Sequence, residues 1–220
     1  MSRCIVKHPS ELTNTFLQAV IFATMYSLFT NMQDIYGTPP YSFSTTQVGL
    51  LYLGPGFGFL IAVWFLVPRI DTVYNKLTER NNGESKPEYR LPLANIGAVL
   101  LPVTLFWFAW TVEYRENIHW IVSIIATFFF GLGQVLIFNT LQNYYIDAFA
   151  QYAASAIAAG AVFRSLIGGV VPLFAPTLFD KLGYGWGWSV FAFLTVALAP
   201  SPLLFMRFGE QLRKRFEVDL

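Results

Sequence analysis

Arg164 is the residue whose type and position most strongly suggest chemistry, because it is the only charged residue between 148 and 179. If this stretch is a membrane helix that begins near 152, Arg164 lies roughly 18 Å along it. A charge near the middle of a bilayer costs at least about 2.5–3.5 kcal/mol, so the side chain must face protein or water. Two interpretations stay open: Arg164 gates or binds a substrate, or it is a structural cation that pairs with a neighbouring helix.

A second group of polar residues lies near the end of the preceding apolar stretch. Asn139, Gln142 and Asn143 are three or four residues apart, so they share one helix face, which Asp147 continues. Gln134 lies deeper in the same stretch. Amide side chains in a membrane either join helices by hydrogen bonds, which is the commoner case, or line a path for a solute. Asp147 is expected near the membrane boundary, where a carboxylate is ordinarily solvated.

Other candidate groups are few. Asp34 is a possible proton or cation acceptor, although its place at the end of an apolar stretch favours a solvated carboxylate. His8 and His119 lack a second histidine or a carboxylate at metal-ligand spacing, so we expect no metal site and no cofactor. A lone Cys4 allows no disulfide within the chain. No nucleophile motif or intramembrane carboxylate pair is present, and the sequence does not predict an enzyme.

The composition shows whether these residues belong to a protein that folds in water or in lipid. The chain has 220 residues, of which 55% are hydrophobic and only 12% are charged. An ordinary soluble domain carries about 25% charged residues. The 14 basic and 13 acidic side chains nearly cancel, which argues against a nucleic-acid partner. We therefore expect the apolar surface of this protein to lie in a lipid bilayer.

Six stretches with almost no charge are each long enough for a transmembrane helix, which needs about 20 apolar residues. A soluble helical protein would have shorter helices with a polar face, and barrel strands would be about half as long with strict alternation. We therefore predict an all-α membrane protein with six transmembrane helices. The spans are expected near 14–35, 47–67, 91–112, 119–145, 152–179 and 187–206.

The orientation follows from the distribution of Lys and Arg among the connections. Almost all of these residues lie in the segments 1–13, 68–90 and 207–220, which alternate along the chain with segments that are poor in them. Because basic residues are retained in the cytoplasm, we expect 1–13 and 207–220 to be cytoplasmic tails and 68–90 a cytoplasmic loop. The bundle itself is expected at 14–206.

Small residues recur at helical spacing in two of the predicted spans. Such rows let helix backbones approach closely, so we expect them to pack helices together. The candidate packing residues are Gly54 and Gly58 in the second span and Gly160, Gly168 and Gly169 in the fifth.

Several motifs together resemble a known family. The string NTLQNYYIDAFAQYAASAIAAGAVFRSLIGG from Asn139 onward, the string VGLLYLGPGFGFLIA and the loop GESKPEYRLPL resemble the fungal drug:proton antiporter branch of the major facilitator superfamily, which includes polyamine exporters. The resemblance implies a twelve-span fold built from two six-span halves, of which this chain is similar to the C-terminal half. The gating and antiporter motifs of the family's N-terminal half cannot be mapped onto this chain.

The resemblance also implies a function. It predicts a secondary active transporter, or half of one, that exports a small organic molecule by proton antiport. The expected cargo is a fungal secondary metabolite, toxin, drug or polyamine, and the expected membrane is the plasma membrane or, less readily, the vacuole. A missing N-terminal half or a second copy of the chain would complete the carrier. The alternative is a truncated, non-transporting remnant or a membrane scaffold that pairs with another half-transporter.

In this picture Arg164 supplies the positive charge of the site. We expect the amides of Asn139 and Gln142 among its neighbours. No acidic residue of this chain lies equally deep in a predicted span, so the coupling carboxylate is expected in the other half.

Overall fold

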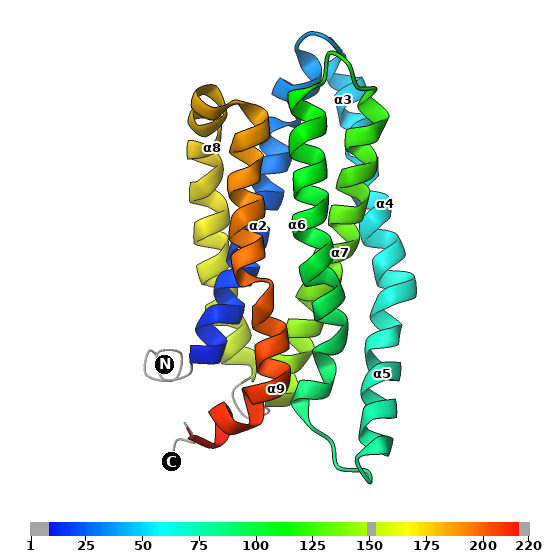
Figure 1. The fold of residues 1–220 in the computed structure, drawn as a ribbon, viewed down its shortest axis with the longest axis vertical. Coiled ribbons are helices and arrows are strands. Elements are labelled where there is room, and N and C mark those ends of the chain that lie inside the picture. Colours follow the sequence, from blue (N-terminus) through cyan, green and yellow to red (C-terminus); the bar gives the residue numbers. More distant parts are fainter. Residues whose placement is uncertain (1–8, 149–152, 216–220) are drawn as a thin grey trace.

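The computed structural model describes residues 9–148 and 153–215, and every regular element in these two ranges is a helix. The helices run roughly parallel or antiparallel along one long axis (Figure 1). In chain order they are α2 (Pro9–Gly37), α3 (Thr45–Leu51), α4 (Leu53–Ile61), the π-helix η1 (Ala62–Leu66), α5 (Val67–Arg80), the 3-10 helix η2 (Pro87–Arg90), α6 (Pro92–Glu113), α7 (Trp120–Ala148), α8 (Ala153–Leu198) and α9 (Pro200–Arg215).

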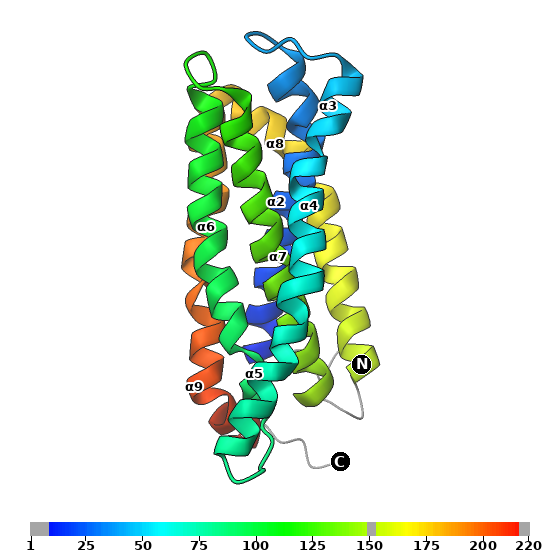
Figure 2. The ribbon, with the colours of Figure 1, turned by 90° about the vertical axis from the view of Figure 1, so that its right-hand side faces the viewer.

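The elements α3, α4, η1 and α5 form one nearly continuous helical stretch along the side of α7 (Figure 2). It begins at a capping box, in which the Ser44 amide donates to the Gln47 side chain and the Gln47 amide donates to the Ser44 hydroxyl. The π-helical turn ends at Leu66, two residues before Pro68, which has no amide hydrogen for a regular helical bond. A wider turn at this point carries the chain past the proline without ending the helix.

The long element α8 contains a reversal at Gly183. This residue has φ 74° and ψ 169°, a conformation that glycine adopts readily and other residues do not. In Figure 1 the chain turns back at this end of the bundle, so α8 has two arms, one on each side of Gly183. The reversal is fixed to the end of α6, because the Gly185 amide donates a 2.7 Å hydrogen bond to the Glu113 carboxylate.

Within residues 9–148 and 153–215, four helical stretches are long and apolar enough to cross a membrane: Thr45–Arg80, Pro92–Glu113, Trp120–Ala148 and Ala153–Arg207. The described part of the chain is thus all-helical with four membrane-type stretches, which confirms the predicted helical class but does not show the six predicted spans. The helix α2 is 29 residues long but is not among these four stretches. Its buried face carries five polar side chains, which make it less apolar: Asn14, Gln18, Thr24, Ser27 and Asn31.

Close contacts between backbones join α4 to α7. A Cβ atom added to Gly58 would overlap the Phe128 carbonyl group, and one added to Gly54 would lie 2.6 Å from the Ile124 side chain. A side chain larger than hydrogen at either glycine would therefore force these two helices apart.

The glycines of α8 differ from one another. A Cβ on Gly168 would lie 2.8 Å from the Phe22 ring of α2, whereas one on Gly160 would approach Thr15 only at 3.9 Å. A Cβ on Gly169 would have no atom within 4 Å. Of the three predicted packing glycines in α8, only Gly168 lies where a larger residue would collide with a neighbouring helix.

Candidate functional site

Arg164 lies on the first arm of α8 and points its guanidinium group at aromatic rings of two other helices. Its Cζ atom is 4.7 Å from the centroid of the Phe138 ring on α7 and 5.9 Å from that of the Phe22 ring on α2. The two rings are stacked with each other at 6.3 Å. Within the described ranges no carboxylate lies within ion-pair distance of Arg164. Three helices therefore position one cation, and aromatic faces take the place of a counter-ion.

If Arg164 lies near mid-membrane, as its place in the predicted span 152–179 indicates, these rings compensate only part of the cost of the charge. A cation–π contact contributes about 0.5–2 kcal/mol, depending on how far it is removed from water. Placing an arginine at mid-membrane costs at least about 2.5–3.5 kcal/mol. A guanidinium group is planar, stays charged and can bind a carboxylate or phosphate through two parallel hydrogen bonds. The arrangement at Arg164 can therefore receive an anionic group beside two aromatic surfaces.

The predicted amides of α7 take other partners. The Asn139 side chain donates to the Val135 carbonyl of its own helix at 3.0 Å. The Gln134 amide contacts the Met25 sulfur at 2.9 Å, and its buried oxygen accepts no hydrogen bond from the described residues. Gln142 and Asn143 are half-buried. In the described structure no hydrogen bond joins Arg164 to any of these amides, and the ring contacts of its guanidinium group are with Phe22 and Phe138.

Asp147 takes part in a second charged cluster, at the end of the bundle where α5, η2 and α7 meet. The Arg90 Nε atom donates a 2.7 Å hydrogen bond to Asp147, and its Nη1 atom donates to Asp71 on α5. The same guanidinium group lies 4.1 Å above the Tyr74 ring. Burial lowers the pKa of Arg90, but the hydrogen bonds to Asp147 and Asp71 outweigh burial, so the net shift is upward. This cluster, which we call the Arg90 cluster, ties three elements together through one cation.

Sequence reasoning missed the Arg90 cluster, although the sequence contains a signal for it. Arg90 directly precedes the uncharged stretch 91–112, and Asp147 directly follows the uncharged stretch 117–146. Antiparallel neighbouring helices bring the start of one such stretch beside the end of the next. Opposite charges at these two positions therefore indicate an ion pair, whereas Asp147 considered alone indicates only a solvated end.

Asp34 lies at the opposite end of the bundle and has an exposed side chain. Its backbone carbonyl accepts a hydrogen bond from the Thr38 hydroxyl at 2.6 Å. Arg115 lies nearby, donates to the Ile35 carbonyl at 3.2 Å and lies over the Tyr184 ring at 5.3 Å. Among the described residues Asp34 makes no ion pair, and it lies far along α2 from the Arg164 site.

Comparison with known proteins gives these sites a context. The chain is 40% identical over 214 residues to the MFS transporter cpaT of Aspergillus oryzae. The aligned region covers 96% of this chain and 42% of that protein. It is 40% identical over 212 residues to the MFS-type transporter penM of Penicillium rubens, which covers 96% of the chain and 41% of the relative. It is 41% identical to the MFS-type efflux pump MFS2 of Trichophyton rubrum, again over 96% of the chain but 35% of the relative.

The chain is a homologue of part of a fungal MFS transporter. It spans about two fifths of the length of the curated relatives that it matches. No family model matches the chain, and no solved structure matches it. The resemblance to fungal major facilitator transporters is confirmed by these relatives.

The relatives are transporters and pumps rather than enzymes. Together with the four long apolar helical stretches, the homology makes this chain part of a multi-pass membrane protein, as the sequence predicts.

Proposed function

We propose that the chain is a six-crossing half of a secondary transporter that exports a small organic anion by proton antiport. The relatives are named as transporters or efflux pumps, and together they supply the expectation of export. The choice of an anionic cargo rests on Arg164, a cation that lies against the Phe22 and Phe138 rings without a carboxylate partner in the described structure. A fungal secondary metabolite or another small organic molecule with an acidic group would suit this site.

The six crossings are assigned from the helices. We assign one crossing each to α2, to the stretch from α3 to α5, to α6 and to α7, and one to each arm of α8, the second continued by α9. The reversal at Gly183 supports the division of α8. The basic residues of 1–13, 68–90 and 207–220 support cytoplasmic tails and a cytoplasmic loop. We place the bundle at 14–206 and the transporter in the plasma membrane.

The partner that completes the carrier is a second six-crossing half. The faces of α4, η1 and the first arm of α8 are apolar and unpartnered, with Trp64 and Leu173 each 74% exposed. A Cβ on Gly56 or Gly169 meets no atom within 4 Å, so these faces also offer small residues on which another helix could pack. Two halves that rock around a central site would alternately open Arg164 to each side of the membrane.

Proton coupling is assigned to the other half. The uncharged stretches of this chain carry no acidic side chain at the depth of Arg164. A carboxylate from the other half that faces Arg164 would have its ionised form stabilised, which lowers its pKa. Antiport requires this carboxylate to be ionised while the substrate is bound and protonated after the substrate has left. The low pKa set by Arg164 would favour the ionised form in the first of these states.

The test is export from intact cells. The chain is co-expressed with the part of the Trichophyton rubrum pump MFS2 that it does not match, in cells loaded with fluorescein as the anionic probe or rhodamine 6G as the cationic probe. We expect export of fluorescein that stops when a protonophore dissipates the proton gradient. The variant Arg164→Ala should reduce export at least about tenfold, since an interaction with a charged group is worth about 1.5–3 kcal/mol.

The matched control is Arg69→Ala, because Arg69 is an exposed arginine on α5 outside the Arg90 cluster. This variant should export normally. If Arg164→Ala also exports normally at equal membrane abundance, Arg164 is a packing residue and the site assignment is wrong. If the unmutated pair exports neither probe nor any compound of a wider metabolite panel, the interpretation as a non-transporting scaffold is favoured.

A further inference from the structure

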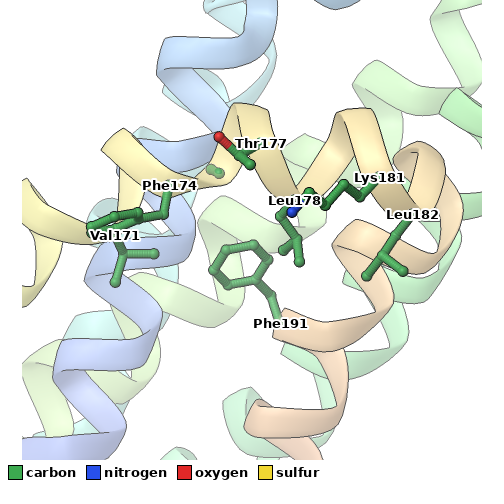
Figure 3. A pocket seen from close by; sticks show the side chains of 8 residues that line it. Val171, Phe174, Thr177, Leu178, Lys181, Leu182 and Phe191 are labelled. Carbon is green, nitrogen blue, oxygen red and sulfur yellow. The ribbon is translucent and has the colours of Figure 1, made fainter.

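A pocket of about 460 Å³ lies between the two arms of α8, away from the Arg164 site (Figure 3). It begins at Val171, which is roughly 10 Å along the helix from Arg164. Its size falls within the range of about 300–1,000 Å³ that is usual for sites of small molecules. The lining is almost entirely apolar and consists of Val171, Phe174, Ala175, Thr177, Leu178, Lys181, Leu182 and Phe191.

The pocket opens toward the surroundings of the bundle. Phe174 is 67% exposed and Leu182 is 46% exposed, although both line it. Phe191, from the second arm, is only 5% exposed and forms the floor. In a multi-pass membrane protein, the surroundings of such a helix are lipid chains or another membrane helix. An apolar hollow of this kind can take up an acyl chain without removing polar groups from water.

Lys181 places a positive charge at the end of the pocket nearest Gly183. It lies two residues before the reversal at Gly183, where the chain leaves the apolar part of the bundle. Val171 is ten positions earlier, so the pocket reaches roughly 15 Å along the helix from Lys181. Figure 3 shows the Lys181 side chain lying along the pocket with its nitrogen beside Leu178.

The charge of Lys181 is not neutralised within the described structure. Its ammonium group makes no ion pair with any described carboxylate. The adjacent Asp180 is one position away on the helix and therefore projects about 100° to the side. From the place beside Leu178 that Figure 3 shows, the flexible Lys181 side chain can extend its charge toward the headgroup level, as lysines at the ends of membrane helices do. There it can contact a phosphate group, for which an ammonium is a good partner.

We propose that this pocket binds a phospholipid, with one acyl chain against Phe174, Leu178 and Phe191 and the lipid phosphate at Lys181. The apolar lining matches the chain, and the single positive charge at the mouth matches the headgroup. The proposal uses only the membrane location of the chain and does not depend on what is transported. Bound lipid would support the hairpin of α8, whose arms leave this space between them.

Native mass spectrometry of the purified chain tests the proposal. The probes are dioleoyl phosphatidylglycerol, dioleoylglycerol, which has the same chains without the phosphate, and inorganic phosphate. We expect a phosphatidylglycerol adduct that Lys181→Ala weakens about tenfold, because a charge-assisted hydrogen bond is lost. Dioleoylglycerol should bind more weakly, with no difference between Lys181→Ala and the unmutated chain, and inorganic phosphate should not bind.

A second variant tests the apolar part of the pocket. Leu178→Trp should fill it and weaken the adducts of both lipids, while Leu203→Trp, at an exposed site of α9, should not. Lys76→Ala, an exposed lysine on α5, is the control for charge. Circular dichroism checks that each variant is folded.

Equal phosphatidylglycerol adducts in Lys181→Ala and the unmutated chain would overturn the proposal, as would equal adducts in Leu178→Trp. Binding of inorganic phosphate with the same dependence on Lys181 would assign the site to a free anion instead. Arg164→Ala should leave the lipid signal unchanged, so the lipid site and the transport site can fail independently.

Discussion

Two arginines of this chain have opposite surroundings. Arg90, at one end of the bundle, donates hydrogen bonds to Asp147 and Asp71 and covers the Tyr74 ring. Arg164, within the first arm of α8, lies over Phe138 and Phe22 and pairs with no carboxylate in the described structure. The first cation is neutralised by its own chain, whereas the second is left available for a partner from outside.

We propose that the difference separates a structural charge from a functional one. Removing Arg90 would leave a carboxylate without its partner, so Arg90 should contribute to the stability of the bundle. Removing Arg164 would leave only rings behind, so its presence costs stability that the fold itself does not recover. Charged groups that persist in membrane helices at such a cost usually belong to substrate or ion pathways. Each prediction below tests one side of this comparison.

The largest expected effect is that of Arg90→Ala. Breaking a buried ion pair costs about 3–5 kcal/mol, because one charge is left unpaired. The Asp147 side chain is 25% exposed and therefore keeps some water, so we expect a loss of about 2–3 kcal/mol in the free energy of unfolding. The measurement is unfolding by sodium dodecyl sulfate in mixed micelles, with Arg69→Ala as the control. A loss no larger than that of Arg69→Ala would show that the Arg90 cluster does not stabilise the fold.

Arg164→Leu, unlike Arg90→Ala, is expected to raise the free energy of unfolding. Replacement removes the cost of a mid-membrane charge, about 2.5–3.5 kcal/mol, and loses cation–π contacts of about 0.5–2 kcal/mol. The free energy of unfolding should therefore rise by about 1–2 kcal/mol while export is lost. A variant that gains stability and loses function would mark Arg164 as a functional residue. A clear loss of stability in the same unfolding assay would instead assign Arg164 to the same structural class as Arg90.

Much of the fold could be predicted from the sequence, because the membrane imposes a simple rule. A helix that crosses lipid must contain a long run without charges, and such runs are visible without any knowledge of tertiary contacts. Pro92–Glu113 and Trp120–Ala148 lie where uncharged stretches occur. The helix α2 is less obvious by hydropathy, since polar residues such as Asn14 and Gln18 face inward and are hidden from lipid.

The surroundings of Arg164 could not be predicted in the same way. Its depth follows from counting residues along one helix. Its partners Phe22 and Phe138 belong to helices far away in the sequence, and aromatic residues occur on nearly every helix of this chain. The amides at Asn139 and Gln142 looked more suitable as partners by type. The face of α7 that contacts α8 is set by long-range packing of the helices. The residues near Asn139 do not reveal it by themselves.

A smaller loss is expected from Asp147→Asn. The amide can still accept a hydrogen bond from Arg90 but carries no charge, and Asp71 continues to balance the cation. The hydrogen bond keeps its charged donor, so the variant loses only the attraction between the two opposite charges. For a partly exposed ion pair this attraction is worth about 1 kcal/mol or less, and the loss should be about 1 kcal/mol. In a double-mutant cycle with Arg90→Ala the two losses should not add, because both remove one interaction. Additive losses would show that Asp147 and Arg90 act separately.

The smallest effect is expected from Asp71→Asn, although Asp71 contacts the same guanidinium group. Its side chain is 68% exposed, against 25% for Asp147, so water already satisfies much of its charge. Exposed ion pairs contribute about 0–1 kcal/mol, and we expect a loss of about 0.5 kcal/mol or less. The loss should disappear near 1 M salt, where the screening length falls to about 3 Å, while that of Asp147→Asn should persist in part. Equal losses for the two variants at both salt concentrations would mean that exposure does not rank the partners of Arg90.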